Sequence, residues 1–92
     1  MIKSLSILMP SYNNLCGGFV EELRRQAESI GSDGFRYEII VADDGSPDPS
    51  FTMANSSINK LGCCRYIVRK ENVGRAAIRN FLASEAQYEY LL

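Results

Sequence analysis

The feature that most constrains this chain is an apolar run that ends in two adjacent carboxylates. Residues 39–42 are all apolar, Asp43 and Asp44 follow directly, and residues 45–47 (Gly-Ser-Pro) then break the pattern. An unbroken apolar run of this kind is typical of a strand covered on both faces of a parallel sheet. Open α/β sheets bind ligands outside the carboxyl ends of their strands. The acid pair therefore predicts a ligand-binding edge.

Strand-like and helix-like segments alternate along the chain. Apolar segments at 5–9, 37–42, 64–68 and 88–92 predict four strands, the first of them halted by Pro10. Helical spacing predicts helices that begin at Gly18, after Pro49 and after Gly74. The order β-α-β-α-β-α-β predicts a three-layer α/β/α domain with a mainly parallel, Rossmann-like sheet. The sequence stops inside an apolar segment, so we expect residues 1–92 to be one domain that is incomplete at its C-terminal end.

Each predicted helix has an apolar stripe that should face the sheet. Gly62 is placed to cap the second helix. The predicted inward residues are Phe19, Val20, Leu23, Ala27 and Ile30 in the first helix, Phe51, Ala54, Ile58 and Leu61 in the second, and Ala77, Ile78, Phe81, Leu82 and Ala86 in the third.

Composition excludes several classes of function. A net charge of −1 gives no electrostatic case for a nucleic-acid partner. The sequence has no apolar stretch long enough for a transmembrane segment and no signal peptide, so we expect a cytoplasmic location, membrane-peripheral at most for the intact protein. Histidine is absent, which excludes imidazole metal ligands. The three cysteines form no disulfide or zinc pattern, and we interpret them as small apolar residues.

Three loops should meet at the carboxyl edge of the sheet, at 10–13, 43–46 and 69–75. A tyrosine ring can stack on a base, a carboxylate can accept from a base N–H, and an arginine beside a helix start can bind a diphosphate. This combination predicts a nucleotide site. Simpler interpretations stay open at this point: Tyr12 as a loop aromatic, Asp43 as a turn residue, Asn72 as a helix cap and Arg69 as a solvated strand end.

Other α/β classes fit less well. A dinucleotide-binding module would have G-x-G-x-x-G after the first strand, where this chain has residues 10–14 (Pro-Ser-Tyr-Asn-Asn). A phosphoacceptor domain would have an aspartate after the third strand, where this chain has Arg69 and Lys70. The alternative that remains is a non-catalytic nucleotide-binding or structural fragment, with an exposed sheet edge that pairs two copies into a homodimer.

Three blocks together resemble the N-terminal nucleotide-binding half of the inverting, GT-A-fold glycosyltransferases of family two. They are residues 6–13 (Ser-Ile-Leu-Met-Pro-Ser-Tyr-Asn), 38–46 (Glu-Ile-Ile-Val-Ala-Asp-Asp-Gly-Ser) and 71–80 (Glu-Asn-Val-Gly-Arg-Ala-Ala-Ile-Arg-Asn). Their order and spacing fit that family along the whole chain. The resemblance implies a nucleotide-diphosphate sugar as donor, with a UDP-sugar favoured.

The resemblance also implies roles for individual residues. Tyr12 would pack on the base, Asp44 would accept from a base N–H, and Asp43 would support the turn. The donor-binding residues that it assigns are Pro10, Tyr12, Asp44, Gly74 and Arg75.

The chemical step would depend on residues beyond this sequence. The resemblance implies a divalent metal, Mg or Mn, held by an acid motif just after Leu92, and a catalytic base later still. The intact enzyme would transfer a sugar with inversion to a hydroxyl of a glycan or lipid-linked acceptor. No residue of this chain is then assigned to catalysis or to metal binding. We expect the fragment to lack activity alone.

Overall fold

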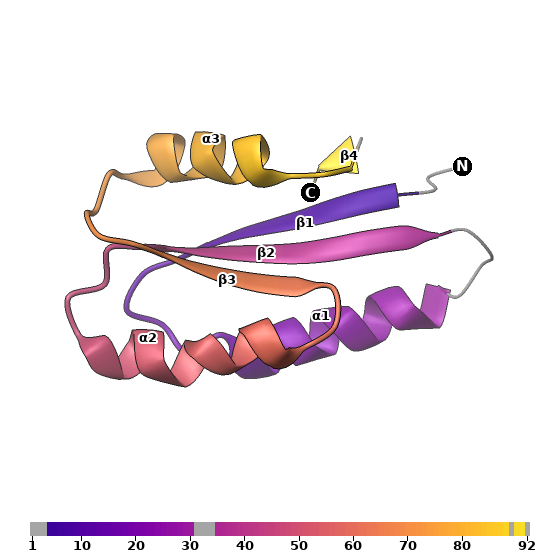
Figure 1. The fold of residues 1–92 in the computed structure, drawn as a ribbon, viewed down its shortest axis with the longest axis horizontal. Helices are drawn as coiled ribbons and strands as arrows, with labels where there is room; N and C mark the ends of the chain where they lie inside the picture. Colours follow the sequence, from indigo (N-terminus) through magenta and orange to yellow (C-terminus); the bar gives the residue numbers. More distant parts are fainter. Residues whose placement is uncertain (1–3, 31–34, 89, 92) are drawn as a thin grey trace.

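The computed structural model describes residues 4–30, 35–88 and 90–91, which form one parallel sheet between two helical layers. The strands lie in the order β3-β2-β1-β4, and every pair is parallel. Helices α1 and α2 cover one face and α3 covers the other (Figure 1), which confirms the predicted α/β architecture. The elements are β1 (Ser4–Ser11), α1 (Gly17–Ile30), β2 (Arg36–Asp44), α2 (Pro49–Asn55), the 3-10 helix η1 (Ser56–Lys60), β3 (Cys64–Arg69), α3 (Arg75–Glu85) and β4 (Tyr90–Leu91).

Strand β2 supplies the centre of the core because it is covered on both faces. Ile39 and Val41 pack in the cluster that includes residues of α1 and η1. Ile40 and Ala42 pack instead against residues of α3. This alternation is the two-residue period of a strand. It continues through the last two residues of β2, Asp43 and Asp44, which are therefore strand residues and not part of the turn.

Strand β1 ends beside the acid pair, in a register that runs from Ser4 opposite Arg36 to Ser11 opposite Asp43. The prediction that Pro10 halts this strand is wrong, since Pro10 pairs with Ala42. In the described residues β4 pairs only with Leu5 and Ser6, so one side of β1 is open at Pro10. A proline without an N–H group is tolerated on such an open side because no ladder hydrogen bond is lost.

The helices bury narrower stripes than their apolar spacing predicts. In α1 the buried residues are Val20 and Ala27, which form a single row along the helix. In α2 the buried residue is Asn55, a polar neighbour of a predicted one. The residues predicted to face the sheet that are exposed instead are Phe19, Ile30, Ala54 and Ala77.

None of the described helices combines the length and the apolar character that a membrane span requires.

The turn before β3 differs from its prediction. Helix α2 continues into η1, and Leu61, not Gly62, is the cap residue. Cys63 takes the left-handed conformation with a φ of 64°, and it is exposed. Of the three cysteines predicted to be small apolar residues, Cys16 and Cys64 are buried, whereas Cys63 is exposed.

The segment between α3 and β4 is attached to the sheet by buried polar groups. Glu38 Oε2 accepts hydrogen bonds from the Ser6 hydroxyl and from the Gln87 N–H group, both at 2.6 Å. Ser6 Oγ in turn accepts a hydrogen bond from the Tyr88 N–H group at 3.2 Å. Ser6 and Glu38 are both buried and lie opposite each other in register, near the amino ends of β1 and β2. This network joins the α3–β4 connection to the end of the sheet away from the acid pair.

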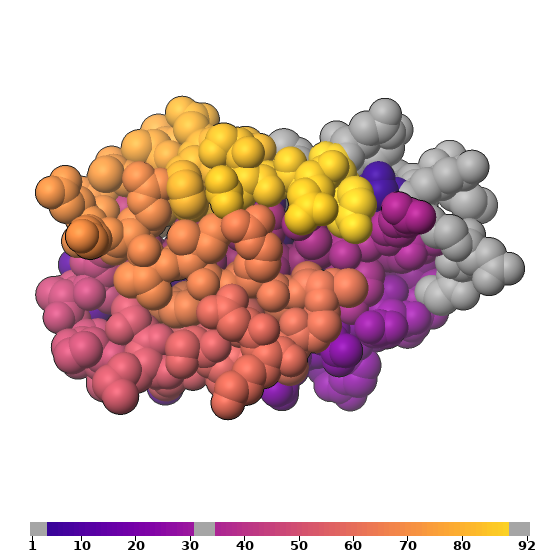
Figure 2. Space-filling model, in the orientation of Figure 1, coloured from indigo at the N-terminus to yellow at the C-terminus, as the bar shows by residue number. Residues whose placement is uncertain are grey.

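Strand β3 forms one edge of the sheet in the described part of the chain. Figure 2 shows its side chains at the surface, between the α2–η1 layer and α3. Val68 is exposed at this edge, and Arg65 and Arg69 belong to the same strand. Charges on an edge strand typically oppose edge-to-edge pairing. The homodimer through this edge stays a prediction.

Candidate functional site

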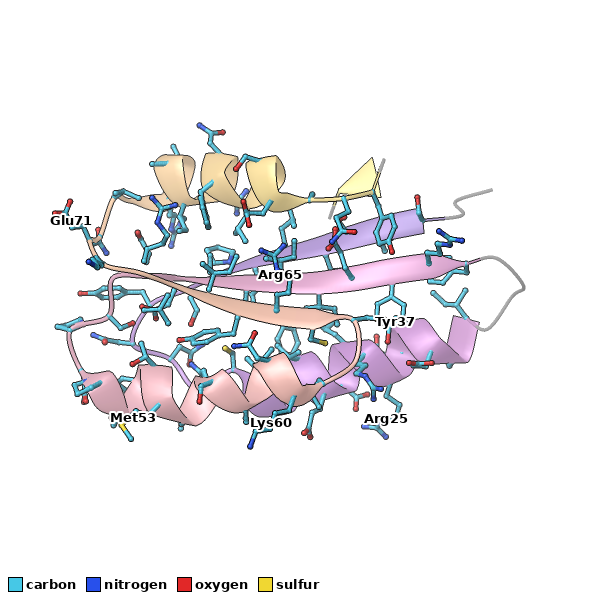
Figure 3. All side chains as sticks on the ribbon, in the orientation of Figure 1. Arg25, Tyr37, Met53, Lys60, Arg65 and Glu71 are labelled. Atoms are coloured by element: carbon cyan, nitrogen blue, oxygen red, sulfur yellow. The ribbon has the colours of Figure 1, made fainter. Side chains whose placement is uncertain are left out.

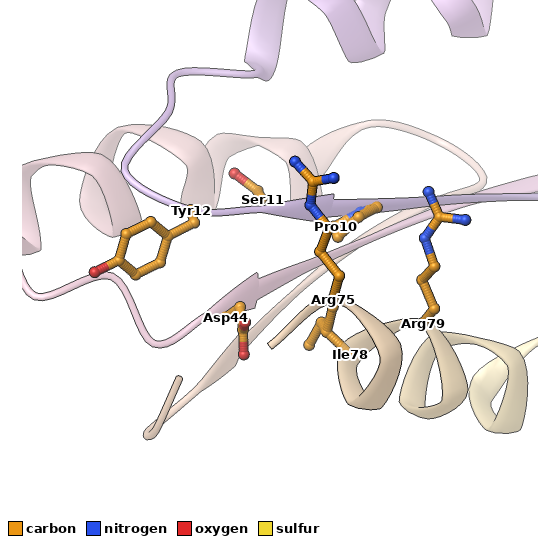
Figure 4. Close-up of a pocket in the computed structure, with 7 residues that line it drawn as sticks. All are labelled: Pro10, Ser11, Tyr12, Asp44, Arg75, Ile78 and Arg79. Atoms are coloured by element: carbon orange, nitrogen blue, oxygen red, sulfur yellow. The ribbon is translucent and has the colours of Figure 1, made fainter. Parts of the chain in front are cut away.

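A pocket of about 420 Å³ opens at the carboxyl edge of the sheet, between the ends of β1 and β2 and the start of α3. This volume is in the range of small-molecule sites, about 300–1,000 Å³. We call it the edge pocket. Figure 4 shows the Tyr12 ring at one end and Arg79 at the other, with Asp44 and Arg75 between them. Its lining residues are Pro10, Ser11, Tyr12, Asp44, Arg75, Ile78 and Arg79.

Four of the predicted donor-binding residues therefore meet in one pocket: Pro10, Tyr12, Asp44 and Arg75. Gly74 is not among the lining residues, although its N–H group bonds to Asp44. Sequence reasoning missed three lining residues. A signal for Arg79 was available, because it lies four residues after Arg75 and so on the same face of α3. Ser11 lies in the 10–13 loop that the sequence places at this edge, and Ile78 is predicted only as an inward residue of the third helix.

Asp44 joins β2 to the start of α3. Its two carboxylate oxygens accept hydrogen bonds from the N–H groups of Val73, at 2.9 Å, and Gly74, at 3.0 Å. Gly74 is the cap residue of α3, and Asp44 supplies from β2 the acceptor for its N–H group and for that of the residue before it. The Asp44 carboxylate thereby fixes where α3 begins. Each of its oxygens can accept a further hydrogen bond from a ligand.

Asp43 acts on the other face of the sheet. Its carboxylate accepts from the Ser46 N–H group at 2.8 Å and from the Ser46 hydroxyl at 2.5 Å. The same hydroxyl oxygen accepts from the Asn13 N–H group at 2.7 Å. Asp43 is fully buried, and through Ser46 it connects the turn after β2 to the loop after β1.

Gly45 brings the turn after β2 against the loop before α3. Its φ of 73° is in the left-handed region, where a side chain is strained. A Cβ atom at this position would lie 2.5 Å from the backbone nitrogen of Asn72 and 2.5 Å from the carbonyl carbon of Glu71. Only glycine allows this approach. The turn after β2 and the loop before α3 are thus in direct contact through backbone.

Arg75 and Arg79 project from α3 toward β1 along the pocket (Figure 4). Neither forms an ion pair with a carboxylate among the described residues. Both are exposed, so their guanidinium groups are available to an anion. Arg69, in the third predicted loop, instead stacks on Phe81, with its guanidinium carbon 3.9 Å from the ring centroid. The cationic part of the pocket therefore comes from α3.

The acids of this site do not form a metal centre. Asp43 and Asp44 bond to groups on opposite faces of the sheet, so their oxygens cannot chelate one ion together. Across the described ranges, no group of three or more His, Cys, Asp or Glu side chains gathers where it could hold a metal ion.

Comparisons with known proteins agree on one family. The family model described as "Glycosyl transferase family 2" matches residues 6–92. A protein of Haemophilus influenzae (strain ATCC 51907 / DSM 11121 / KW20 / Rd), described as "Uncharacterized glycosyltransferase", is 33% identical over 90 residues; the match covers 95% of this chain and 33% of that protein.

Solved structures of Staphylococcus aureus TarS are also similar. The structure of TarS 1-349 has a TM-score of 0.65 at 25% identity, covering 97% of this chain and 26% of that one. The structure of TarS has a TM-score of 0.63 at 25% identity, covering 97% of this chain and 16% of that one. The chain thus spans about a third or less of these proteins' length. From the family match and the shared fold, the chain belongs to glycosyltransferase family 2.

Proposed function

We propose that this chain forms the donor-binding part of a glycosyltransferase and takes a nucleotide-diphosphate sugar, with uridine as the favoured base. The observation that best supports the proposal is that the Tyr12 ring, the Asp44 carboxylate and the arginines of α3 line the same pocket. These groups match the three chemical parts of a nucleoside diphosphate. The aromatic ring can face the base, the carboxylate can accept from the edge of the base, and the two cations can bind the phosphates.

At the base end, Tyr12 is 48% exposed and can present its ring to a ligand. Stacking of a base on an aromatic side chain contributes about 1–3 kcal/mol. Pro10 adds an apolar wall, and the Asp44 carboxylate can accept a hydrogen bond from a ring N–H. Uracil offers such a ring N–H group, whereas cytosine has an acceptor nitrogen at that position. This difference favours a uridine nucleotide.

At the phosphate end, binding depends on the side chains of α3. The N–H groups of Val73 and Gly74 are already bonded to Asp44, so they are not free for an anion. Arg75 and Arg79 are free of ion pairs with described carboxylates and can each form two hydrogen bonds to phosphate oxygens. The guanidinium pair would neutralise part of the diphosphate charge and orient it along α3.

For the intact enzyme we propose transfer with inversion and a divalent metal on the diphosphate. Asp44 is the one acid among the lining residues of the edge pocket, and both of its oxygens already accept from backbone amides. It is therefore a poor base for an acceptor hydroxyl. We expect the chain itself to bind donor without transferring sugar.

Calorimetric titration with UDP and with uridine tests the proposal. Tyr12→Ala should weaken binding of both ligands by about 5- to 150-fold, the equivalent of one stacked base. Asp44→Ala should also weaken both, and Arg79→Gln should weaken UDP but leave uridine unchanged. Lys60→Gln is the matched control, because Lys60 lies at the end of η1 and points away from the sheet (Figure 3). No binding by the folded wild-type chain, or equal binding by wild type, Tyr12→Ala and Asp44→Ala, would contradict the proposal.

A further inference from the structure

Asn55 is a buried polar residue outside the edge pocket, at the end of α2, and only 1% of it is exposed. Both ends of its side-chain amide bond to the backbone of the loop after β1. Its Oδ1 accepts from the Cys16 N–H group at 3.0 Å, and its Nδ2 donates to the Asn14 carbonyl at 2.7 Å. One partner is a donor and the other an acceptor, so only an amide of this orientation satisfies both.

The loop that these bonds hold, residues 12–16, carries Tyr12. It contributes no residue to the sheet, and Asn13 has a φ of 46°, a conformation that side chains rarely adopt. Four of its backbone groups are bonded to other elements: the Asn13 N–H group to Ser46, the Asn14 carbonyl and Cys16 N–H group to Asn55, and the Cys16 carbonyl to the Val20 N–H group of α1. Asn55 thus makes two of these four attachments, in the loop that carries the aromatic side chain of the pocket.

Asn55 also begins an Asn-Ser-Ser sequence, the pattern of an N-glycosylation acceptor. Its nitrogen is buried and already donates to Asn14, so this residue does not present an acceptor amide at the surface. The Asn55 side chain therefore acts inside the fold, on the loop after β1.

We propose that Asn55 is a positioning residue for the donor base: it holds the Tyr12 loop in the conformation that binds the base, without lining the pocket itself. This inference rests on the proposed function, since it assumes that the base stacks on Tyr12. A loop held in place before binding loses less conformational freedom when the ligand arrives. Removal of the amide should therefore weaken binding through Tyr12.

Asn59 offers a matched control a few residues along the chain, in η1. Its amide also bonds twice to the backbone, with Oδ1 accepting from the Tyr66 N–H group at 2.8 Å and Nδ2 donating to the Tyr66 carbonyl at 3.3 Å. These bonds hold β3 and not the Tyr12 loop. Asn59→Ala therefore removes the same chemical group and the same number of hydrogen bonds, away from the pocket.

The test is a double-mutant cycle with uridine as ligand. Asn55→Ala should weaken uridine binding by about 3- to 10-fold, as expected when a preorganised loop becomes mobile. In a Tyr12→Ala background it should have no further effect, and Asn59→Ala should leave uridine affinity unchanged. Hydrogen exchange supplies a readout without ligand, in which the Cys16 amide should exchange faster in Asn55→Ala only. If Asn55→Ala does not fold, Asn55→Asp serves, since it keeps the acceptor for Cys16 and loses the donor to Asn14.

Two results would overturn the inference while leaving the proposed function intact: equal weakening by Asn55→Ala and Asn59→Ala, or additive effects of Asn55→Ala and Tyr12→Ala. Full uridine affinity in Tyr12→Ala alone would overturn the proposed stacking and this inference with it. The two failures are therefore distinguishable.

Discussion

Asp43 and Asp44 are adjacent in β2, yet their carboxylates hold different loops on opposite faces of the sheet. Asp43 accepts two hydrogen bonds from Ser46, and Asp44 accepts from the N–H groups of Val73 and Gly74. The alternation of side chains along a strand produces this separation. The acid pair is thus two independent supports for two walls of the edge pocket.

Replacement of Asp43 should destabilise the fold strongly. Asp43→Ala removes a buried charged acceptor from two donors on Ser46, and we expect it to lower the free energy of unfolding by on the order of 2–3 kcal/mol. Asp48→Ala is the control. Asp48 also accepts from a backbone N–H group, that of Ser50, but it lies at the exposed start of α2. Urea denaturation measures both variants. An Asp43→Ala cost no larger than that of Asp48→Ala would contradict the supporting role of Asp43.

Gly45 should tolerate no side chain. Gly45→Ala combines a left-handed φ with a Cβ atom 2.5 Å from two backbone atoms of the neighbouring loop, and we expect a loss of more than about 2 kcal/mol in stability. Gly18→Ala lies in α1 with nothing within 4 Å of the new Cβ, and it should stabilise the chain by up to about 1 kcal/mol. Thermal unfolding monitored by circular dichroism distinguishes the two, and equal melting temperatures would show that the loops do not touch as described.

Two tyrosines should respond in opposite ways to loss of their hydroxyl groups. The Tyr66 hydroxyl is buried and has no hydrogen-bond partner within the described ranges, so Tyr66→Phe should leave stability unchanged or raise it by up to about 1 kcal/mol. The Tyr37 hydroxyl donates to Glu28 at 2.9 Å, and burial together with this carboxylate raises the pKa of Tyr37. Tyr37→Phe should therefore cost about 1 kcal/mol. Chemical denaturation of both variants checks the pair, and a larger loss for Tyr66→Phe would reverse the assignment.

The three cysteines should differ sharply in reactivity. Cys63 is exposed, whereas Cys16 and Cys64 are buried, and burial raises the pKa of both buried thiols. Because the thiolate is the reactive form, iodoacetamide should modify Cys63 first at neutral pH, and the other two only when the chain is unfolded. Peptide mapping by mass spectrometry gives the order of labelling. Early modification of Cys16 in the folded chain would contradict the buried core beneath the Tyr12 loop.

The fold was largely predictable because it depends on repeated local signals. Apolar segments separated by helical spacing indicate a parallel α/β sheet, and parallel strands bring their loops to one edge, so the meeting of Tyr12, Asp44 and Arg75 could be expected. Pro10 was misleading, because a proline ends a strand only where its missing N–H would have been bonded, and that depends on the extent of β4.

The supports of the site could not be predicted in the same way. Asp44 bonds to Val73 and Gly74, and Asn55 bonds to Asn14 and Cys16, across separations of about 30 to 40 residues. Such contacts have no local pattern in the sequence. A buried asparagine on an otherwise apolar helix face is visible only once the face is known, and the apolar stripe had suggested its neighbour Ala54.

The buried pair Ser6 and Glu38 has a consequence for the engineering of this fold. They secure the α3–β4 connection at the amino ends of the strands, while the loops of the edge pocket lie at the carboxyl ends. The two ends of the sheet therefore have different structural roles: one attaches the α3–β4 connection and the other carries the edge pocket. Libraries that randomise the exposed lining residues should leave the end that contains Ser6 and Glu38 untouched, whereas a change at Glu38 would remove the acceptor that holds the segment after α3.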